Sequence, residues 1–221
     1  MRRLFTFASI MFLAKTPTLI QFLLPSMIWK MSGTDKSLYL TFDDGPIPEI
    51  TPWVLETLDQ YQAKATFFCV GDNVRKHPEI YSQLIQRGHA TGNHTFNHLN
   101  GWTNHNDHYL ENVNKCRDLV SGNLFRPPYG RISPKQFRQL KKEYQIVMWD
   151  VLSGDFSANL KPEVCLNNVL RNAKAGSIIV MHDSLKAEKN LRYVLPKILD
   201  FYSESGYTFK SIPQSITNAN Q

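Results

Sequence analysis

Short apolar runs alternate with amphipathic stretches along the chain from Ser37 to Ile212. The apolar runs are rich in β-branched and aromatic residues and end at turn-forming residues, a pattern that predicts strands. The stretches between them repeat their apolar positions at helical spacing, often with a proline near the first turn. The predicted strands cover residues 38–42, 65–70, 89–93, 124–125, 145–151, 177–181 and 207–212. The predicted helices cover residues 51–61, 78–87, 109–120, 134–144, 162–173 and 191–203.

This order amounts to about seven strand-then-helix units, which predicts a parallel sheet with helices packed on it. The wholly apolar run Ile178-Ile179-Val180 is typical of a strand that is buried on both faces. The first predicted strand is followed by Asp43-Asp44-Gly45-Pro46 and not by a glycine-rich phosphate loop, which argues against an open dinucleotide-binding sheet. We therefore expect an α/β protein whose sheet closes into a (β/α) barrel.

The length of 221 residues is enough for one domain with a sizeable core. We expect the barrel to cover residues 37–213, with a short tail at residues 214–221. Residues 1–36 are expected to form an N-terminal apolar arm or a signal or anchor segment. If residues 1–14 are a signal segment, the protein is exported or membrane-associated, because a charged start precedes an apolar run. If Met11 is the true start, we expect a cytoplasmic protein whose short arm packs on the domain.

The composition is that of an ordinary globular protein, with 42% hydrophobic and 20% charged residues and a net charge of +6. Lys and Arg are scattered, so we expect no nucleic-acid partner and at most a weak attraction to an anionic polymer. The three cysteines, Cys69, Cys116 and Cys165, are too few and too far apart for a disulfide framework or a CxxC metal site.

Chemically versatile side chains follow the carboxyl ends of most predicted strands. They are Asp43 and Asp44, His94, Arg126, Asp150 or Asp155, and His182. Because the carboxyl ends of parallel barrel strands share one face, we expect these side chains to meet there. An Asp-Asp-Gly-Pro sequence by itself is more often a turn, but a purely structural reading does not explain this gathering at one end of the strands.

Two histidines in the segment after the third predicted strand are four residues apart, at His94 and His98. With a carboxylate from elsewhere, such a pair makes a three-ligand site for a divalent metal that leaves one position open. An isolated pair of histidines is more often a surface feature. A rival pair, His105 and His108, lies further from the strand end.

The segment Arg126-Pro127-Pro128-Tyr129-Gly130 predicts a rigid turn directly after a strand. Such a turn holds a backbone N–H in a fixed position, as an oxyanion hole requires. His182 ends an apolar strand and is placed to act as a general acid.

At this point the chain resembles the polysaccharide deacetylase (NodB-homology) family, carbohydrate esterase family four. The resemblance runs from about Ser37 to Ile212 and rests on five motifs in the family's order. The motifs are Thr41-Phe42-Asp43-Asp44-Gly45-Pro46, His94-Thr95-Phe96-Asn97-His98, Arg126-Pro127-Pro128-Tyr129-Gly130, Leu152-Ser153-Gly154-Asp155-Phe156 and Val180-Met181-His182. It implies a distorted (β/α)7 barrel that removes N-acetyl groups from a polysaccharide containing N-acetylglucosamine, such as peptidoglycan or chitin-type oligomers.

The resemblance also implies a role for each motif residue. Asp44, His94 and His98 would bind the metal, for which Zn²⁺ is favoured and Co²⁺ or Ni²⁺ are alternatives. Among the catalytic residues, Asp43 would be the general base, Arg126 would orient it, and the Tyr129 backbone N–H would hold the oxyanion. His182 would be the general acid, with its pKa tuned by Asp155. Pro128, Phe156 and Val180 would line the substrate pocket.

The fourth and fifth motifs depart from the family pattern. Leu152 replaces an acidic residue and Phe156 replaces a tryptophan, so Asp150 is an alternative to Asp155 as the partner of His182. Val180 stands where leucine is common and keeps the pocket wall apolar. None of these changes removes the expected base, acid or metal ligands, and we expect an active enzyme.

Three other functions fit the same motifs. One is an O-acetyl esterase that acts on xylan or another acetylated glycan, and another is an amidase for a small non-sugar substrate. The third is a non-catalytic sugar-binding barrel, although a pure binder needs no combination of acid, base and metal. Peripheral membrane or cell-wall association is a further expectation, and the sequence does not indicate an oligomeric state.

Overall fold

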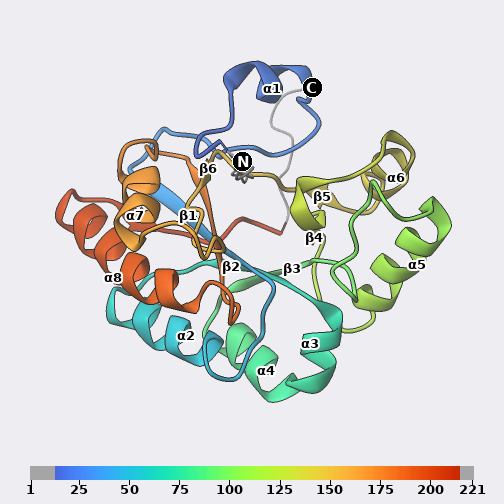
Figure 1. Cartoon of the computed structure of the whole chain (residues 1–221), viewed down its shortest axis with the longest axis horizontal. Helices are drawn as coiled ribbons and strands as arrows, with labels where there is room; N and C mark the ends of the chain where they lie inside the picture. The colour runs from blue at the N-terminus through green and yellow to red at the C-terminus, as the bar shows by residue number, and fades with distance from the viewer. Residues whose placement is uncertain (1–12, 215–221) are drawn as a thin grey trace, which may run out of the picture.

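The computed structural model describes residues 13–214, and a curled parallel sheet forms its centre (Figure 1). The strands follow one another in space in the order β5-β4-β3-β2-β1-β7-β6, and β8 pairs with the start of β1. Their bounds are β1 Ser37–Asp43, β2 Thr66–Cys69, β3 Ala90–Asn93, β4 Leu124–Phe125, β5 Gln145–Ile146, β6 Val151–Leu152, β7 Ile178–His182 and β8 Thr208–Phe209. The expected distorted (β/α)7 barrel is therefore confirmed.

Strand β1 lies in the middle of this sheet, and every one of its residues is buried. It pairs in parallel with β2 on one side and with β7 on the other. In this register Asp43 lies opposite Phe68 of β2 and His182 of β7. The pairing thus brings the ends of β1 and β7 together, although their residues are far apart in the sequence.

The helices cover the outer surface of the curled sheet, as Figure 1 shows from α7 and α8 round to α5 and α6. They are α2 Thr51–Gln60, α3 Gly71–Lys76, α4 Pro78–Gln86, α5 Asn106–Arg117, α6 Pro134–Leu140, α7 Pro162–Leu170 and α8 Glu188–Glu204. Their apolar faces pack on the sheet, and the largest core cluster joins α2, α7 and α8 to β1 and β7. This packing is the amphipathic pattern that the sequence predicted.

The predicted strand at residues 145–151 is wrong as a single element, because it divides into β5 and β6. Strand β5 pairs with β4 at one end of the sheet, whereas β6 pairs with β7 at the other end. The four residues between them, 147–150, cross the gap that separates the two edges. A continuous apolar run does not reveal that its two halves have different neighbours.

The N-terminal arm, defined here as residues 13–30, fills the remaining opening beside this crossing. It contains α1 (Thr18–Leu23), the helix at the top of Figure 1. Ile28 exchanges backbone hydrogen bonds with the segment around Val147, and Lys15 forms an isolated bridge with Val151. The arm therefore supplies main-chain partners to strand edges that would otherwise be open.

Other predicted boundaries differ by a few residues. The helix expected at 134–144 ends at Leu140, the last strand is restricted to Thr208–Phe209, and α1 and α3 were not predicted. No helix among residues 13–214 is long and apolar enough to cross a membrane. The expected signal segment at residues 1–14 and the tail at 214–221 lie almost entirely outside the described residues.

Candidate metal centre and catalytic site

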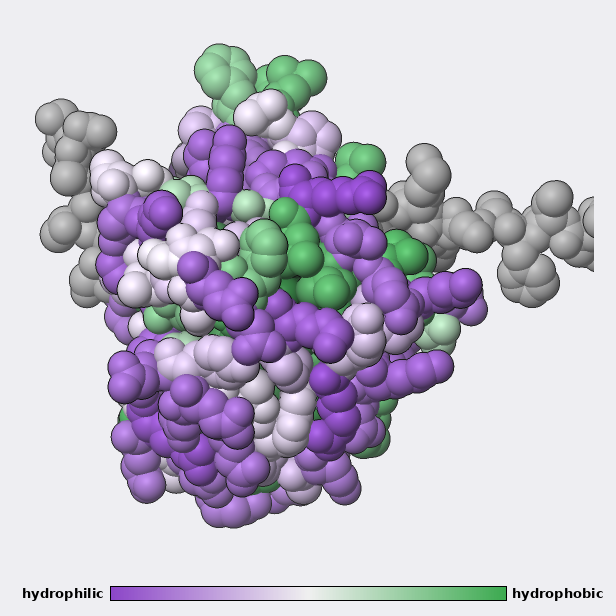
Figure 2. Space-filling model, turned by 90° about the vertical axis from the view of Figure 1, so that its left-hand side faces the viewer, coloured by the Kyte–Doolittle hydropathy of each residue, from purple (hydrophilic) through white to green (hydrophobic). Residues whose placement is uncertain are grey.

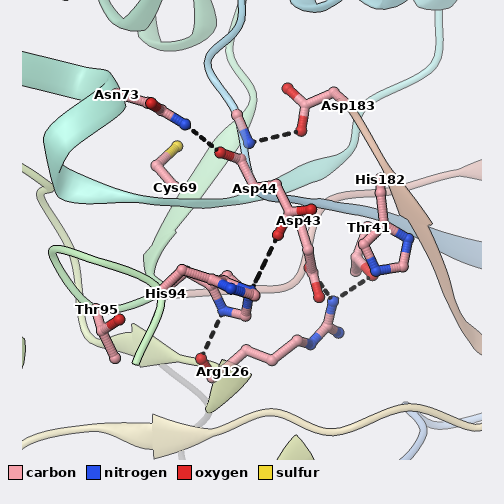
Figure 3. A network of polar contacts seen from close by, with 12 residues as sticks. Thr41, Asp43, Asp44, Cys69, Asn73, His94, Thr95, Arg126, His182 and Asp183 are labelled. Atoms are coloured by element: carbon pink, nitrogen blue, oxygen red, sulfur yellow. Dashed lines mark hydrogen bonds and ion pairs between the residues drawn. The ribbon is translucent and has the colours of Figure 1, made fainter. Parts of the chain in front are cut away.

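The end of β1 presents two consecutive carboxylates at the carboxyl face of the barrel (Figure 3). Asp43 is 4% exposed and is the last residue of the strand. Asp44 follows with a positive φ of 86°, a conformation that few residues other than glycine adopt. In a regular strand, consecutive side chains point to opposite faces of the sheet. Here the turn at Asp44 ends the strand, and the two carboxylates have different partners.

Asp44 is part of a compact group with His94 and His98, whose ligand atoms all lie within 4.8 Å of one another. The Oδ1 atom of Asp44 is 3.2 Å from Nε2 of His98 and 3.8 Å from Nε2 of His94. That oxygen is buried and has no hydrogen-bond partner within residues 13–214. One carboxylate and two imidazoles are a donor set that suits a divalent cation.

The tautomer of His94 also fits a metal ligand. Its Nδ1 lies 2.7 Å from the backbone oxygen of Arg126, and because a carbonyl can only accept, Nδ1 carries the proton. The lone pair of neutral His94 is then on Nε2, which faces Asp44. Burial lowers the pKa of His94 to about 4, so the ring is neutral near pH 7. This is the arrangement in which an outer hydrogen bond orients a ligating histidine.

The charge of Asp44 is maintained by its surroundings. Burial alone would raise the pKa of its carboxyl, but the neighbouring His98, His182 and His94 together lower it below its usual value. Asn73 of α3 donates from Nδ2 to the backbone oxygen of Asp44 at 2.7 Å and supports the turn from the other side. The residues present therefore fit a divalent cation in the positions that the fold gives them.

Asp43 is paired with Arg126, which follows β4. The Nη1 atom of Arg126 donates to Oδ1 of Asp43 at 2.6 Å and to the hydroxyl of Thr41 at 2.7 Å. The same guanidinium donates to the backbone oxygens of Val147 and Met148, and it is completely buried. Arg126 thus holds Asp43 in one orientation inside the barrel.

His182, the last residue of β7, is paired with Asp155. Its Nδ1 lies 2.9 Å from Oδ1 of Asp155, and its backbone N–H donates to Oδ2 at 2.8 Å. Burial lowers the pKa of His182, but the charges of Asp155, Asp44 and Asp43 outweigh this effect and raise it to about 9. His182 is therefore an imidazolium at neutral pH, with Nε2 free of this interaction.

Asp150, the alternative partner of His182, lies elsewhere. Its carboxylate is 2.6 Å from both the ammonium of Lys15 and the hydroxyl of Ser177, and Gln21 also donates to it. These contacts attach the N-terminal arm to the start of β7. The structure therefore places Asp155, and not Asp150, beside the histidine.

The turn after β4 lies against the metal-ligating cluster. Tyr129 has a φ of 60° inside the short 3-10 helix Pro128–Gly130, and its ring packs edge-on against His98 with centroids 4.6 Å apart. The Phe156 ring packs against His182 at 5.1 Å. Val180 lies two residues before His182 on β7 and is buried on the same face of the strand. Of the three expected pocket residues, Phe156 contacts His182, Pro128 precedes Tyr129 in the turn, and Val180 lies on the strand that ends at His182.

The sequence did not single out Asp183, which is fully buried beside the β1 turn. Its Oδ1 accepts the backbone N–H of Gly45 at 3.0 Å, and its Oδ2 accepts the hydroxyl of Thr51 at 2.6 Å. Burial, with a contribution from Asp44, raises the pKa of Asp183 to about 8 despite these hydrogen bonds. The sequence feature that could have identified Asp183 is its position directly after His182, at the end of a predicted strand.

The rival histidines do not join the cluster. His105 and His108 are exposed at the start of α5, and among residues 13–214 only Asp44, His94 and His98 form a group that could hold a metal ion. The carboxyl face therefore combines an ordered carboxylate, three convergent side chains that could hold a metal ion, and a protonated imidazole. Such a combination can activate a water, polarise a carbonyl and protonate a leaving group.

Comparison with known proteins identifies relatives in sequence and in fold. The model of the family described as polysaccharide deacetylase matches residues 30–149. A peptidoglycan-N-acetylglucosamine deacetylase of Bacillus cereus is 37% identical over 199 residues, covering 84% of this chain and 91% of the relative. A chitooligosaccharide deacetylase of Azorhizobium caulinodans is 32% identical over 207 residues, covering 83% of this chain and 96% of the relative.

The fold comparison agrees with the sequence comparison. A crystal structure of a peptidoglycan N-acetylglucosamine deacetylase superposes with a TM-score of 0.82 at 30% identity, covering 90% of this chain and 95% of that one. The superposition thus covers nearly all of both chains, as expected for two proteins that share one fold.

Proposed function

This chain belongs to the polysaccharide deacetylase family, and from that premise we propose that it hydrolyses N-acetyl groups on a glycan containing N-acetylglucosamine. Peptidoglycan is the first candidate and chitin-type oligomers are the second, because the relatives described above act on these polymers. The observation that carries the proposal is the convergence of the Asp43–Arg126 pair, the three metal-ligating residues and the Asp155–His182 pair on one face.

Asp44, His94 and His98 would hold the metal. Zn²⁺ is the proposed ion because two imidazoles and one carboxylate suit it, and Co²⁺ or Ni²⁺ would fit the same ligands. When bound there, a divalent cation polarises the acetamide carbonyl and lowers the pKa of a water molecule.

Asp43 would take a proton from the attacking water. Arg126 donates from Nη1 to Oδ1 of this carboxylate at 2.6 Å and so fixes its orientation. The water oxygen then forms a bond to the carbonyl carbon, and negative charge develops on the carbonyl oxygen. The backbone N–H of Tyr129, held by the rigid turn at Pro128–Gly130, would donate to that oxygen.

His182 would complete the reaction. As the carbon–nitrogen bond breaks, the departing amine takes the proton from Nε2 of the imidazolium, and acetate and a free amino sugar remain. Asp155 holds Nδ1 of the ring and stabilises its positive charge. Val180, Phe156 and Pro128 would surround the methyl of the acetyl group with apolar surface.

The test is acetate release from N-acetylglucosamine oligomers, peptidoglycan and acetylated xylan by chelator-treated protein, with and without added Zn²⁺ or Co²⁺. We expect metal-dependent release from the N-acetylated substrates. Release from xylan alone would replace the proposal with an O-acetyl esterase. Metal binding without release from any substrate would favour a small-amide substrate or a sugar-binding barrel.

Metal binding has its own readout in thermal unfolding. Zn²⁺ at about a hundred times its Kd should stabilise the folded protein by about 2.7 kcal/mol and raise the Tm by roughly 5–11 °C. An Asp44→Asn variant should lose most of this rise, whereas a variant at the rival pair, His105→Ala, should keep it. An equal rise in wild type and Asp44→Asn would place the metal elsewhere.

We further propose that the protein works at a membrane surface outside the cytoplasm, where peptidoglycan is found. Large exposed apolar side chains gather on the N-terminal arm, at Leu13, Leu19, Ile20, Phe22, Leu23 and Leu24. Figure 2 shows apolar residues protruding at the top of the molecule, where Figure 1 places α1. Co-sedimentation with phosphatidylglycerol vesicles should fall when Phe22 and Leu23 are both changed to Ser. Equal binding of wild type and this variant would exclude the arm as the membrane contact.

A further inference from the structure

The loop between β3 and α5 contains an exposed tryptophan that the proposed catalytic steps do not use. Trp102 is 66% exposed, although indole side chains are usually highly buried. It lies in the loop between β3 and α5, four residues after the metal-ligating His98. This loop leaves the carboxyl end of β3, the end of the sheet at which the site lies.

Trp102 is held in place in spite of its exposure. Its indole Nε1 donates to the backbone oxygen of Ile132 at 3.2 Å, and its backbone N–H donates to the side chain of Asn100 at 3.0 Å. The guanidinium of Arg131 lies over the ring, 5.2 Å from the centroid. A ring that is fixed before a ligand arrives loses little conformational entropy on binding.

The loop that presents Trp102 is itself packed tightly against the next loop. A Cβ at Gly101 would lie 2.5 Å from the backbone oxygen of Arg131, so only glycine permits this approach. Gln136 of α6 donates to the oxygen of Gly101 at 2.9 Å. The loop therefore has a defined position relative to the turn that carries Tyr129.

The segment that follows β4 contacts both Trp102 and the proposed metal-binding cluster. The Tyr129 ring packs against His98 and is 61% exposed. Arg131 follows Tyr129 by two residues and reaches Trp102. Arg131 is exposed and has no ion-pair partner among residues 13–214 that would hold its guanidinium away from a ligand. Two exposed aromatic rings, and a guanidinium that lies over one of them, thus belong to the two segments beside His98.

We propose that Trp102, with Arg131, forms a subsite for a sugar residue neighbouring the one that is deacetylated. The apolar face of a pyranose ring stacks on an indole, while sugar hydroxyl and acetamide oxygens accept from the guanidinium. Aromatic residues and arginine are enriched among the residues that contribute most of the binding energy in recognition sites. This inference rests on the proposed function and specifies its substrate as a glycan chain and not a single sugar.

The test compares Trp102→Ala with Trp102→Tyr on N-acetylglucosamine oligomers of increasing length. The loss of an aromatic contact of about 1.4 kcal/mol corresponds to a tenfold increase in the dissociation constant of the glycan. We expect KM for the pentasaccharide to rise roughly tenfold in Trp102→Ala with kcat unchanged, while the disaccharide shows a smaller change. Trp102→Tyr, which keeps an aromatic face, should retain most of the wild-type KM. Phe201→Ala, at an exposed aromatic near the far end of α8, is the matched control and should match wild type.

Calorimetric titration of the pentasaccharide into wild type, Trp102→Ala and Phe201→Ala separates the subsite from the reaction. If wild type releases no acetate from any oligomer, the proposed function fails, yet weaker binding by Trp102→Ala alone would still support the subsite. If wild type is active and Trp102→Ala has the wild-type KM and Kd at every length, the subsite is refuted while the proposed function stands. A uniform loss of kcat in Trp102→Ala would also refute it, since it would indicate a structural role for the indole.

Discussion

The Nη1 atom of Arg126 lies 2.6 Å from Oδ1 of Asp43 in the interior of the barrel, where the arginine side chain is completely shielded from water and the aspartate nearly so. Two charges in such a place are tolerated because each satisfies the other. The pair joins β4 to β1, so it connects the fold to the expected general base. Removing one partner should therefore affect both stability and activity.

We expect Arg126→Met to lower the free energy of unfolding by about 3–5 kcal/mol, because Asp43 is left as an unpaired buried charge. Deacetylation should be lost in parallel. Adding Asp43→Asn to this variant should restore part of the stability, since the unpaired charge is then gone. Urea unfolding of the two single variants and the double variant measures the coupling. Strictly additive losses would contradict a direct pair.

The pH dependence of kcat/KM should report the Asp155–His182 pair. Burial lowers the pKa of His182, and the neighbouring carboxylates, Asp155 foremost, raise it to about 9. Because the imidazolium is the expected proton donor, activity should fall as pH rises through the pKa of His182. Asp155→Asn removes the largest raising influence, so this alkaline decline should move to lower pH. The comparison is made at one metal concentration, since a cation at Asp44 offsets part of that carboxylate's effect.

Asp150→Asn is the matched control for this pH profile, because Asp150 contacts Lys15 and Ser177 and does not face the histidine. It should leave the alkaline decline in place.

Unfolding experiments on metal-free protein provide an independent check. The folded-state pKa of His182 lies above its unfolded value of about 6.5, so the stability from this histidine is complete below that pH. The stability advantage of wild type over Asp155→Asn should therefore shrink as pH rises from about 6.5 through about 9. A pH-independent difference would argue against the pair.

Gly45 should be required because of Asp183. A Cβ at Gly45 would lie 1.9 Å from Oδ2 of Asp183, far inside contact distance. We expect Gly45→Ala to lower the free energy of unfolding by about 1–3 kcal/mol, the usual cost of overpacking, and to reduce activity by displacing the Asp43-Asp44 turn. In an Asp183→Ala background the same change should cost much less, because the clash is gone. Equal costs in both backgrounds, measured by chemical denaturation, would show that Asp183 does not set this requirement.

The N-terminal arm should contribute stability without contributing to the reaction. Asp150→Ala removes the carboxylate that Lys15, Gln21 and Ser177 share, and we expect a loss of about 1–3 kcal/mol in the free energy of unfolding. At a temperature where the variant is folded, kcat/KM should equal that of wild type. Loss of activity in a fully folded variant, as judged by circular dichroism, would indicate that the arm shapes the site.

The order of strands and helices, and the end of the barrel at which the candidate site lies, could be predicted from the amino-acid sequence. Apolar runs such as 177–181 indicate buried strands, and a polar residue that follows such a run lies at the end of the strand. For this reason Asp43, Asp44, His94, Arg126 and His182 could be named as candidates before any pairing was known. Their convergence then followed from parallel topology alone.

The order of the strands in the sheet, and the pairing of each carboxylate with its basic partner, could not be predicted in this way. The hydrophobic pattern of a segment indicates that the segment is buried, but not which other segments it packs against. The run at 145–151 therefore gave no sign that its two ends lie at opposite edges of the sheet. The same limit applied to Asp150 and Asp155, which are five residues apart and have entirely different partners. Asp183 and Trp102 were missed for a related reason. Their importance comes from the Gly45 turn and the Ile132 loop, and contacts between segments distant in sequence arise only when the barrel closes.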